Sequence, residues 1–215
     1  MDTLTSGFDF DRAAGWYDFL STLVFGSAIR DLERSLIPHM AERTSLCWIG
    51  GGTGALLPEI LKTCPSLKIE FVELSSNMRR KAARRIDAHH QDSLRFWPSM
   101  EDLSDTGELC DTLFLSCVMD VYTEKQLAPL LCNWTRQRPV ILAVDFVVPA
   151  SGPGRWLAKA MIPLMYRFFH LMIGLPVIPL PDWEATLCRC GYEKQFSKKA
   201  WLGMLTASVW VPSGV

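Results

Sequence analysis

The sequence has no excess of charge of either sign, and this is the first of several absences that narrow its function. Its 22 basic and 23 acidic side chains give a formal net charge of −1, so no overall field attracts nucleic acid or an anionic surface. The seven cysteines include no Cys-x-x-Cys accompanied by a second pair or a histidine cluster, which argues against a zinc site. An odd number of cysteines, mostly in apolar runs, favours a reduced cytoplasmic setting over a disulfide framework.

Signals for export and for membrane insertion are also missing. Residues 1–4 lack the basic-then-apolar pattern that opens a signal peptide. The apolar stretch 156–180 is broken by Pro163, Pro176 and Pro179, so it lacks the roughly 20 unbroken apolar residues that a spanning helix needs. We therefore predict a helical lid or an interfacial helix there. Because 49% of the chain is apolar, this stretch is the expected place for a lipophilic pocket or a membrane-facing surface.

What is present is a glycine-rich turn between a strand-like and a helix-like run. Residues 45–49 read as a buried strand, Gly50-Gly51-Gly52-Thr53-Gly54 as a tight turn, and 55–62 have the apolar spacing of a helix. Glycine suits positive φ angles and lets a ligand approach the backbone closely. A helix that follows such a turn directs free N–H groups toward whatever lies over it. This pattern indicates a nucleotide-cofactor site.

Strand-like and helix-like runs alternate along the chain, which predicts βαβ units and a parallel sheet. The expected strands are 45–49, 68–73, 94–97, 111–118 and 140–149, followed by a helix over 183–190 and strand-like runs at 193–196 and 203–211. Ser75 or Ser76 caps one helix, which carries a basic run over 79–85, and another helix covers 123–135. The basic run reads as a solvated helix face, with contact to anionic lipid as the alternative.

Ligands of parallel sheets lie at the carboxyl ends of the strands. Those ends here carry the glycine turn, Glu73, residues 97–100, residues 116–120 and Asp145. We expect one domain over 1–215. Its parts are a helical cap (1–44), a cofactor-binding core (45–150), an apolar lid (151–182) and a C-terminal helix with strands (183–215).

With these elements placed, the chain resembles the class I S-adenosylmethionine-dependent methyltransferases along nearly its whole length. Residues 50–54 are similar to the glycine loop of that class, Glu73 to its ribose-binding acid, and 74–78 to the run that follows this acid. Within the class, residues 10–18 and 145–149 look closest to the menaquinone/ubiquinone C-methyltransferase-like family. The resemblance implies an α/β fold, with a Rossmann-like sheet, helices on both faces and a hydrophobic helical cap or lid after strand five.

The resemblance also implies S-adenosyl-L-methionine as cofactor, S-adenosyl-L-homocysteine as product, and methyl transfer to a small hydrophobic acceptor that is quinone-like, phenolic or lipid-like. The cofactor-binding residues that it implies are Tyr17, Gly50, Gly51, Gly52, Thr53, Gly54, Glu73, Leu74, Met78, Ser99, Met100, Glu101 and Ser116. His170 is a candidate base, because histidine side chains titrate near neutral pH. Asp120 is a second candidate base, with contact to the acceptor, stabilisation of the cation or capping of a helix as its other roles. Neither metal nor nucleic acid is expected, and peripheral membrane contact stays open as an alternative.

Two positions depart from the class, and two other functions remain open. Trp48 stands where the class usually has an acid that helps to hold the methionine ammonium, and Ser99 where an adenine-contacting Asp commonly lies. An NAD(P)-dependent oxidoreductase is one alternative, because Gly50-x-Gly52-x-x-Ala55 also fits the dinucleotide pattern, although the chain shows no Tyr-x-x-x-Lys. A non-catalytic protein that keeps the cofactor fold is the other.

Overall fold

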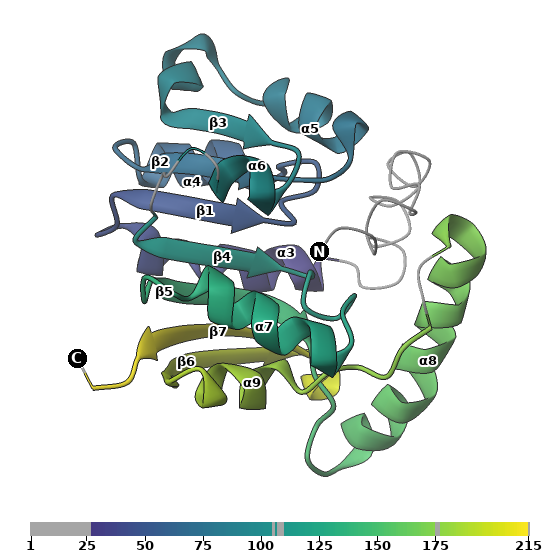
Figure 1. The fold of residues 1–215 in the computed structure, drawn as a ribbon. Helices are drawn as coiled ribbons and strands as arrows, with labels where there is room; N and C mark the ends of the chain where they lie inside the picture. The colour runs from purple at the N-terminus through teal and green to yellow at the C-terminus, as the bar shows by residue number, and fades with distance from the viewer. Residues whose placement is uncertain (1–26, 105, 107–109, 175–176, 215) are drawn as a thin grey trace.

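A seven-stranded sheet with the order β3-β2-β1-β4-β5-β7-β6 forms the centre of the computed structural model (Figure 1). The structure describes residues 27–104, 106, 110–174 and 177–214. The strands are β1 (Ser45–Ile49), β2 (Lys68–Val72), β3 (Leu94–Trp97), β4 (Thr112–Ser116), β5 (Val140–Phe146), β6 (Tyr192–Ala200) and β7 (Leu205–Pro212). The first five pair in parallel, whereas β7 runs antiparallel to both β5 and β6. The predicted α/β sheet is confirmed.

Helices cover both faces of this sheet. On one face lie α3 (Ala28–Arg34), α4 (Leu57–Thr63) and α5 (Ser76–Ala83), and on the other α6 (Met100–Ser104), α7 (Glu124–Trp134) and α9 (Trp183–Arg189). Three short 3₁₀ helices are η1 (Ile37–Met40), η2 (Ala88–Ser93) and η3 (Trp201–Gly203). Since both faces are buried, the central strands are apolar at nearly every position, as parallel strands in α/β proteins are.

The helix starts follow the signals in the sequence. Pro58 lies in the first turn of α4, where its missing N–H costs little. The Ser75 hydroxyl accepts a hydrogen bond from the backbone N–H of Met78 at 3.2 Å, so the predicted cap of α5 is Ser75. A capping box between Thr123 and Gln126 begins α7. This assigns the cap of α7 to Thr123 and removes the capping alternative for Asp120.

Several boundaries differ from the sequence-based expectation. In the described part of the predicted helical cap (1–44), α3 stops at Arg34 and Pro38 lies within the separate 3₁₀ helix η1. The short helix α6 was not predicted. Strand β6 begins at Tyr192 and is longer than the expected 193–196 because its polar residues, Lys198 and Lys199 among them, face solvent on an edge strand.

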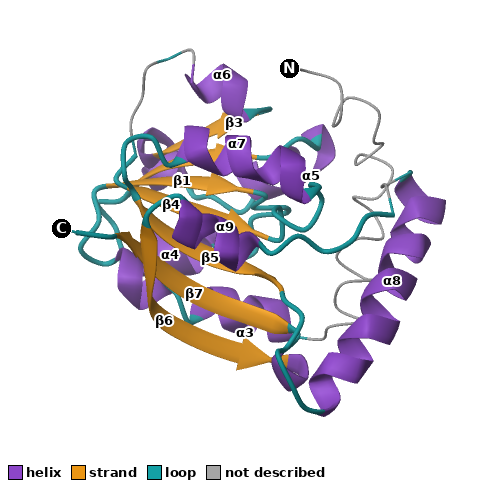
Figure 2. Cartoon of the chain, turned by 60° about the horizontal axis from the view of Figure 1, so that its bottom comes forward, coloured by secondary structure: helices purple, strands orange, loops and turns teal. Residues whose placement is uncertain are grey.

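Helix α8 (Pro153–Ile173) is the lid segment, and it stands beyond the carboxyl ends of the parallel strands (Figures 1 and 2). The expectation that Pro163 breaks this run is wrong, since α8 continues through it. A proline here leaves the carbonyl of Lys159 without its helical partner, and because Pro163 and Lys159 are exposed, water can satisfy that carbonyl. No helix within the described ranges is long and apolar enough to cross a bilayer.

Aromatic packing fixes the face of the sheet beneath α3 and α4. Trp48 is 1% exposed, stacks on Phe114 with ring centroids 5.1 Å apart, and meets Phe71 edge-on at 5.2 Å. A Cβ at Gly51 would come within 2.2 Å of the Phe71 ring, so a glycine at this position of the turn is needed for the same packing. The side chain at position 48 therefore belongs to the core.

Restoring an acid at this position is expected to destabilise the fold. Trp48→Asp removes the stacking and buries a carboxylate among apolar side chains, so we expect a loss of about 4 kcal/mol or more in the free energy of unfolding. Trp48→Phe keeps most of the packing and should cost about 1–2 kcal/mol. Urea denaturation followed by far-ultraviolet circular dichroism measures both. Equal stability of the two variants would contradict this packing.

Candidate functional site

The glycine turn connects β1 to α4 and opens toward solvent at one position. Gly50 has φ +74°, and a Cβ there would lie 2.6 Å from the backbone oxygen of Ser116, which places the turn directly beside the end of β4. Gly52 has φ +56°, and a Cβ there would have no atom within 4 Å. Packing therefore explains Gly50, whereas Gly52 faces a space that a ligand can enter.

Glu73 follows β2 and is hydrogen-bonded to this turn. The Gly52 N–H donates to its Oε2 at 3.0 Å and the Ser75 N–H donates to its Oε1 at 2.9 Å. Glu73 is 8% exposed, so a buried carboxylate with both oxygens anchored lies beside the open position at Gly52. The structure thus brings together the two parts of the predicted cofactor site, the glycine turn and the acid after the second strand.

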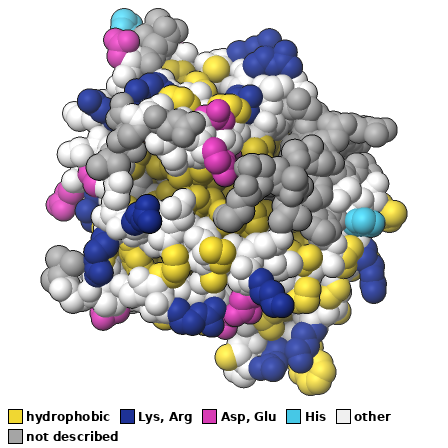
Figure 3. Space-filling view, viewed as in Figure 1, with side chains coloured by type: hydrophobic (Ala, Val, Ile, Leu, Met, Phe, Trp, Pro, Cys, Tyr) yellow, Lys and Arg dark blue, Asp and Glu magenta, His cyan; other side chains and the backbone are white. Residues whose placement is uncertain are grey.

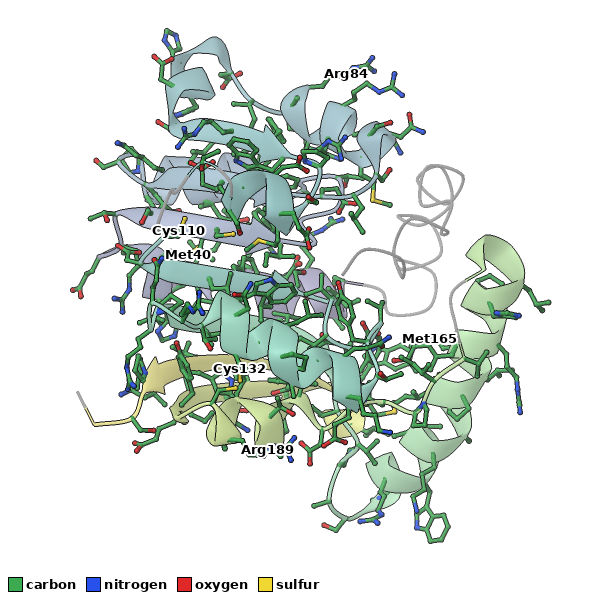
Figure 4. The ribbon with its side chains drawn as sticks, viewed as in Figure 1. Met40, Arg84, Cys110, Cys132, Met165 and Arg189 are labelled. Carbon is green, nitrogen blue, oxygen red and sulfur yellow. The ribbon has the colours of Figure 1, made fainter. Side chains whose placement is uncertain are left out.

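Two arginines of the basic run hold the backbone around these groups. Arg79 donates to the carbonyl oxygens of Glu73 and Leu74, and the Arg85 Nε donates to the carbonyl oxygen of Thr53 at 2.9 Å. Arg84, by contrast, points away from the molecule (Figure 4). The predicted solvated face is therefore only part of the run's role, because Arg79 and Arg85 fix the turn and the segment after β2.

A carboxyl group that sequence reasoning missed lies at the end of β4. The Ser116 hydroxyl donates to Glu33 Oε1, which joins α3 to the strand next to the glycine turn. Burial raises the pKa of Glu33 to about 7, although the Ser116 hydrogen bond and the charge of Arg30 oppose this shift. No local pattern marks Glu33, because its partner lies 83 residues away.

Asp120 lies just beyond β4, beneath α8. The Tyr166 hydroxyl donates to its backbone oxygen at 2.8 Å and lies 3.4 Å from its Oδ2. Its Oδ1 is buried and accepts no hydrogen bond from any described residue. Burial raises the pKa of Asp120 to about 6. A partly unsatisfied carboxyl group thus lies where the strand ends and the lid helix meet.

Asp145 has a structural role at the same edge. It is fully buried and accepts backbone N–H groups of Met119 at 2.8 Å and of Phe146 at 2.7 Å. Its pKa is raised well above the usual value by burial and then by the charge of Asp120. Asp145 therefore holds the segment after β4 in place.

The electrostatics of Cys117 show how closely these acids converge. Its thiol pKa is raised well above the usual value, first by burial and then by the charges of Asp145, Asp120 and Glu33. Three carboxyl groups, from α3, from the segment after β4 and from β5, therefore lie close enough to Cys117 to act on its thiol. Within the described ranges, no three His, Cys, Asp or Glu side chains are arranged to hold a metal ion.

The other predicted site residues take varied positions. Ser99 caps α6, where its hydroxyl accepts from the Asp102 N–H at 3.2 Å. Met100 lies 3.7 Å from Cys47, sulfur to sulfur. Thr53 and Met78 are buried, Leu74 and Glu101 are exposed, and His170 is exposed in the last turn of α8. Tyr17 lies outside the described residues.

The groups at this edge of the sheet favour a ligand that carries positive charge. An open backbone position at Gly52 admits a ligand, and the anchored carboxylate of Glu73 offers an acceptor for hydroxyl groups. The unsatisfied Oδ1 of Asp120 and the carboxyl group of Glu33 favour positive charge nearby. A ligand with both hydroxyl groups and positively charged groups fits this set.

The fold is shared with known methyltransferase structures. No protein-family profile and no curated protein sequence matches the chain. It is similar to an O-methyltransferase family protein from Burkholderia thailandensis (14% identity, TM-score 0.63, 88% of this chain, 58% of that one). It is also similar to the mitomycin 7-O-methyltransferase MmcR, with 14% identity and a TM-score of 0.64 over 87% of this chain and 55% of that one. A third similar structure is DhpI in complex with SAH, with 16% identity and a TM-score of 0.63 over 96% of this chain and 95% of that one. The chain thus spans little more than half the length of the first two. At identities of 14–16%, these TM-scores show that the proteins share a fold.

The raised pKa of Glu33 makes a prediction about stability. A carboxyl group with a pKa of about 7 when folded and about 4.5 when unfolded binds more protons in the folded state. Its contribution to stability is therefore lost as the pH rises from about 4.5 to 7, by at most about 3 kcal/mol. Glu33→Gln should gain stability relative to wild type over that range, measured by urea denaturation. Glu42→Gln, at an exposed position, is the matched control, and a Glu33→Gln difference that does not change with pH would contradict the assignment.

Proposed function

We propose that this chain binds S-adenosyl-L-methionine at the carboxyl ends of β1, β2 and β4 and transfers its methyl group to a small hydrophobic acceptor. The observation that carries the proposal is the hydrogen bond between Gly52 and Glu73, because it joins the open glycine turn to a buried acid in one pocket. A solved structure of the same fold, DhpI, is a complex with SAH. This supports the same cofactor here.

Each part of the pocket has a task in holding the cofactor. Gly52 would admit the methionine portion, and Glu73 would accept hydrogen bonds from the ribose hydroxyl groups. Glu33 would face the ammonium group and thereby take the place of the acid that is absent at Trp48. When bound, the cofactor supplies an electrophilic methyl group on a sulfonium. The protein then has to align an acceptor with that methyl group and to exclude water.

Asp120 is the proposed proton acceptor for an oxygen or ring-carbon nucleophile. Its Oδ1 has no donor among the described residues, and a carboxyl group with a pKa near 6 is mostly ionised at neutral pH. Tyr166 keeps its own proton, because burial and the nearby acids raise its pKa, so it orients Asp120 as a donor. His170, which lies on α8 as Tyr166 does, is a second candidate for the base.

The nature of the methyl acceptor is inferred from the inner face of α8. Its inner face places Ile162, Met165 and Tyr166 toward the body of the molecule, where Met165 lies between α8 and the sheet (Figure 4). Apolar walls beside one buried carboxyl group suit a quinone-like, phenolic or lipid-like acceptor. The closer kinship to the menaquinone/ubiquinone C-methyltransferase-like family is part of this proposal.

The charges favour a methyl donor over a nicotinamide dinucleotide. A dinucleotide would bring an anionic pyrophosphate to the glycine turn, beside the carboxyl groups of Glu33 and Glu73. The antiparallel β7 between β5 and β6 also departs from the 3-2-1-4-5-6 order of dinucleotide-binding sheets. The oxidoreductase is therefore the weaker alternative.

Calorimetric titration with S-adenosylhomocysteine tests the proposed site. Wild type is expected to bind with micromolar affinity. Gly52→Arg should abolish binding, because the new side chain enters the open space over the turn. Glu73→Ala should weaken binding at least tenfold through lost charge-assisted hydrogen bonds.

Gly191→Arg is the matched control. This glycine also has positive φ (+81°) and no atom within 4 Å of an added Cβ, but it precedes β6 at the opposite edge of the sheet. The Gly191→Arg variant should bind S-adenosylhomocysteine as wild type does. Binding of NADPH without binding of S-adenosylhomocysteine would replace the methyltransferase by an oxidoreductase, and binding of neither would favour the non-catalytic alternative.

The pH dependence of binding tests the role of Glu33. Only its ionised form attracts an ammonium group, and its pKa is about 7. The affinity of wild type for S-adenosylhomocysteine should therefore rise by up to roughly 30-fold between about pH 5.5 and 8. Glu33→Gln should bind more weakly at the upper pH and lose most of this dependence. An unchanged pH profile in the variant would assign the ammonium group to another acid.

A further inference from the structure

Helix α8 has a second face that the site does not use. Of the nine large hydrophobic side chains that are exposed in the described part of the chain, five lie on this helix: Trp156, Leu157, Leu164, Phe168 and Leu171. Its inner face is already occupied, since Ala158, Ile162 and Tyr166 are buried against Met204. The exposed side chains are therefore not the core-facing side of an ordinary amphipathic helix.

These side chains are arranged in a row along the helix. Leu157, Leu164 and Leu171 are spaced by seven residues, and Phe168 lies one turn beyond Leu164, so the four project from one side of α8. We call them the outer stripe. Leu164 is 66% and Leu171 is 83% exposed, which leaves these two leucines mostly in contact with water at a considerable hydrophobic cost.

The charged side chains of α8 are all positive. Arg167 lies three residues after Leu164 and four before Leu171, so it borders the outer stripe. Lys159 lies on another side of the helix, with its Nζ 6.0 Å from the ring centroid of the exposed Trp156. Helix α8 contains no Asp or Glu. In Figure 3, hydrophobic and Lys or Arg atoms lie next to one another along the edge that α8 forms.

The turn beneath the first residues of α8 adds another exposed apolar side chain. Leu202 is 66% exposed and has φ +52°, a backbone conformation that is rare for leucine. A Cβ at Gly154 would lie 2.0 Å from the Leu202 carbonyl oxygen, so α8 packs tightly on this turn. Leu202 therefore extends the exposed apolar surface at the N-terminal end of the helix.

We propose that the outer stripe of α8 docks on the surface of an anionic lipid bilayer. Leucines and a tryptophan at the end of the helix can enter the region between headgroups and acyl chains, while long basic side chains reach the phosphates. Charge complementarity favours an anionic bilayer over a second copy of the chain at this surface. A second α8 would bring no Asp or Glu to Arg167 and Lys159, whereas anionic headgroups attract both. The docking surface is separate from the proposed cofactor pocket.

Vesicle co-sedimentation of the full chain tests this proposal. Wild type should bind vesicles that mix phosphatidylglycerol with phosphatidylcholine, and bind phosphatidylcholine alone at least tenfold more weakly. Lys159→Gln with Arg167→Gln should lower the partition coefficient for mixed vesicles about 30-fold. Leu164→Gln with Leu171→Gln should lower it about tenfold for each leucine.

The matched control removes two cations from elsewhere. Lys68 and Arg136 are exposed near the amino ends of β2 and β5, so Lys68→Gln with Arg136→Gln changes the net charge equally and should leave vesicle binding unchanged. All variants should bind S-adenosylhomocysteine as wild type does, which separates this test from that of the cofactor site.

Two outcomes would overturn the proposal. One is that wild type binds neither kind of vesicle, or binds both equally and regardless of the substitutions. The other is that light scattering shows a wild-type dimer that Leu164→Gln with Leu171→Gln converts to a monomer, without vesicle binding. That result would assign the outer stripe to a second copy of the chain.

Discussion

A carboxylate that leaves water loses several kcal/mol of hydration unless donors or a cation replace it, and this constraint organises the carboxyl edge of the sheet. Asp145 accepts N–H groups from Met119, in the segment after β4, and from Phe146, the last residue of β5. Glu73 accepts two more. Glu33 and Asp120 have fewer donors, since Glu33 accepts from the Ser116 hydroxyl and the Oδ1 of Asp120 accepts from no described residue. The contrast separates acids that hold the fold together from acids that remain for a cationic ligand.

The same constraint explains how an acid can be absent from β1 without leaving the pocket uncharged. Position 48 projects into the core between Phe71 and Phe114, where an ionised group has no donor. Glu33 reaches the edge of the sheet from α3, outside that aromatic cluster, and finds a hydroxyl donor at Ser116. Ser116 adjoins Gly50, so the carboxyl group of Glu33 lies beside the glycine turn although it comes from helix α3 and not from strand β1.

Local patterns predicted what local forces determine. The strands over 45–49 and 94–97, the cap at Ser75 and the acid after β2 all depend on neighbouring residues, and the structure has them where the sequence indicated. Glu33 could not be found this way, because its role arises from a contact across 83 residues. The continuation of α8 through Pro163 depends on exposure of the broken turn, which no pattern of residue types specifies.

Helix α8 connects the two proposals physically. Tyr166 on its inner face binds Asp120, and the outer stripe lies on the opposite side of the same 21-residue helix. A helix with its side chains is about 10 Å across, so an acceptor dissolved at a bilayer surface beneath the stripe would be about one helix diameter from the proposed base. A lipophilic acceptor would then travel around α8 without crossing bulk water, which favours acceptors that partition into membranes over polar ones. This relation predicts that substitutions in the stripe reduce turnover of membrane-dissolved acceptors more than turnover of water-soluble analogues.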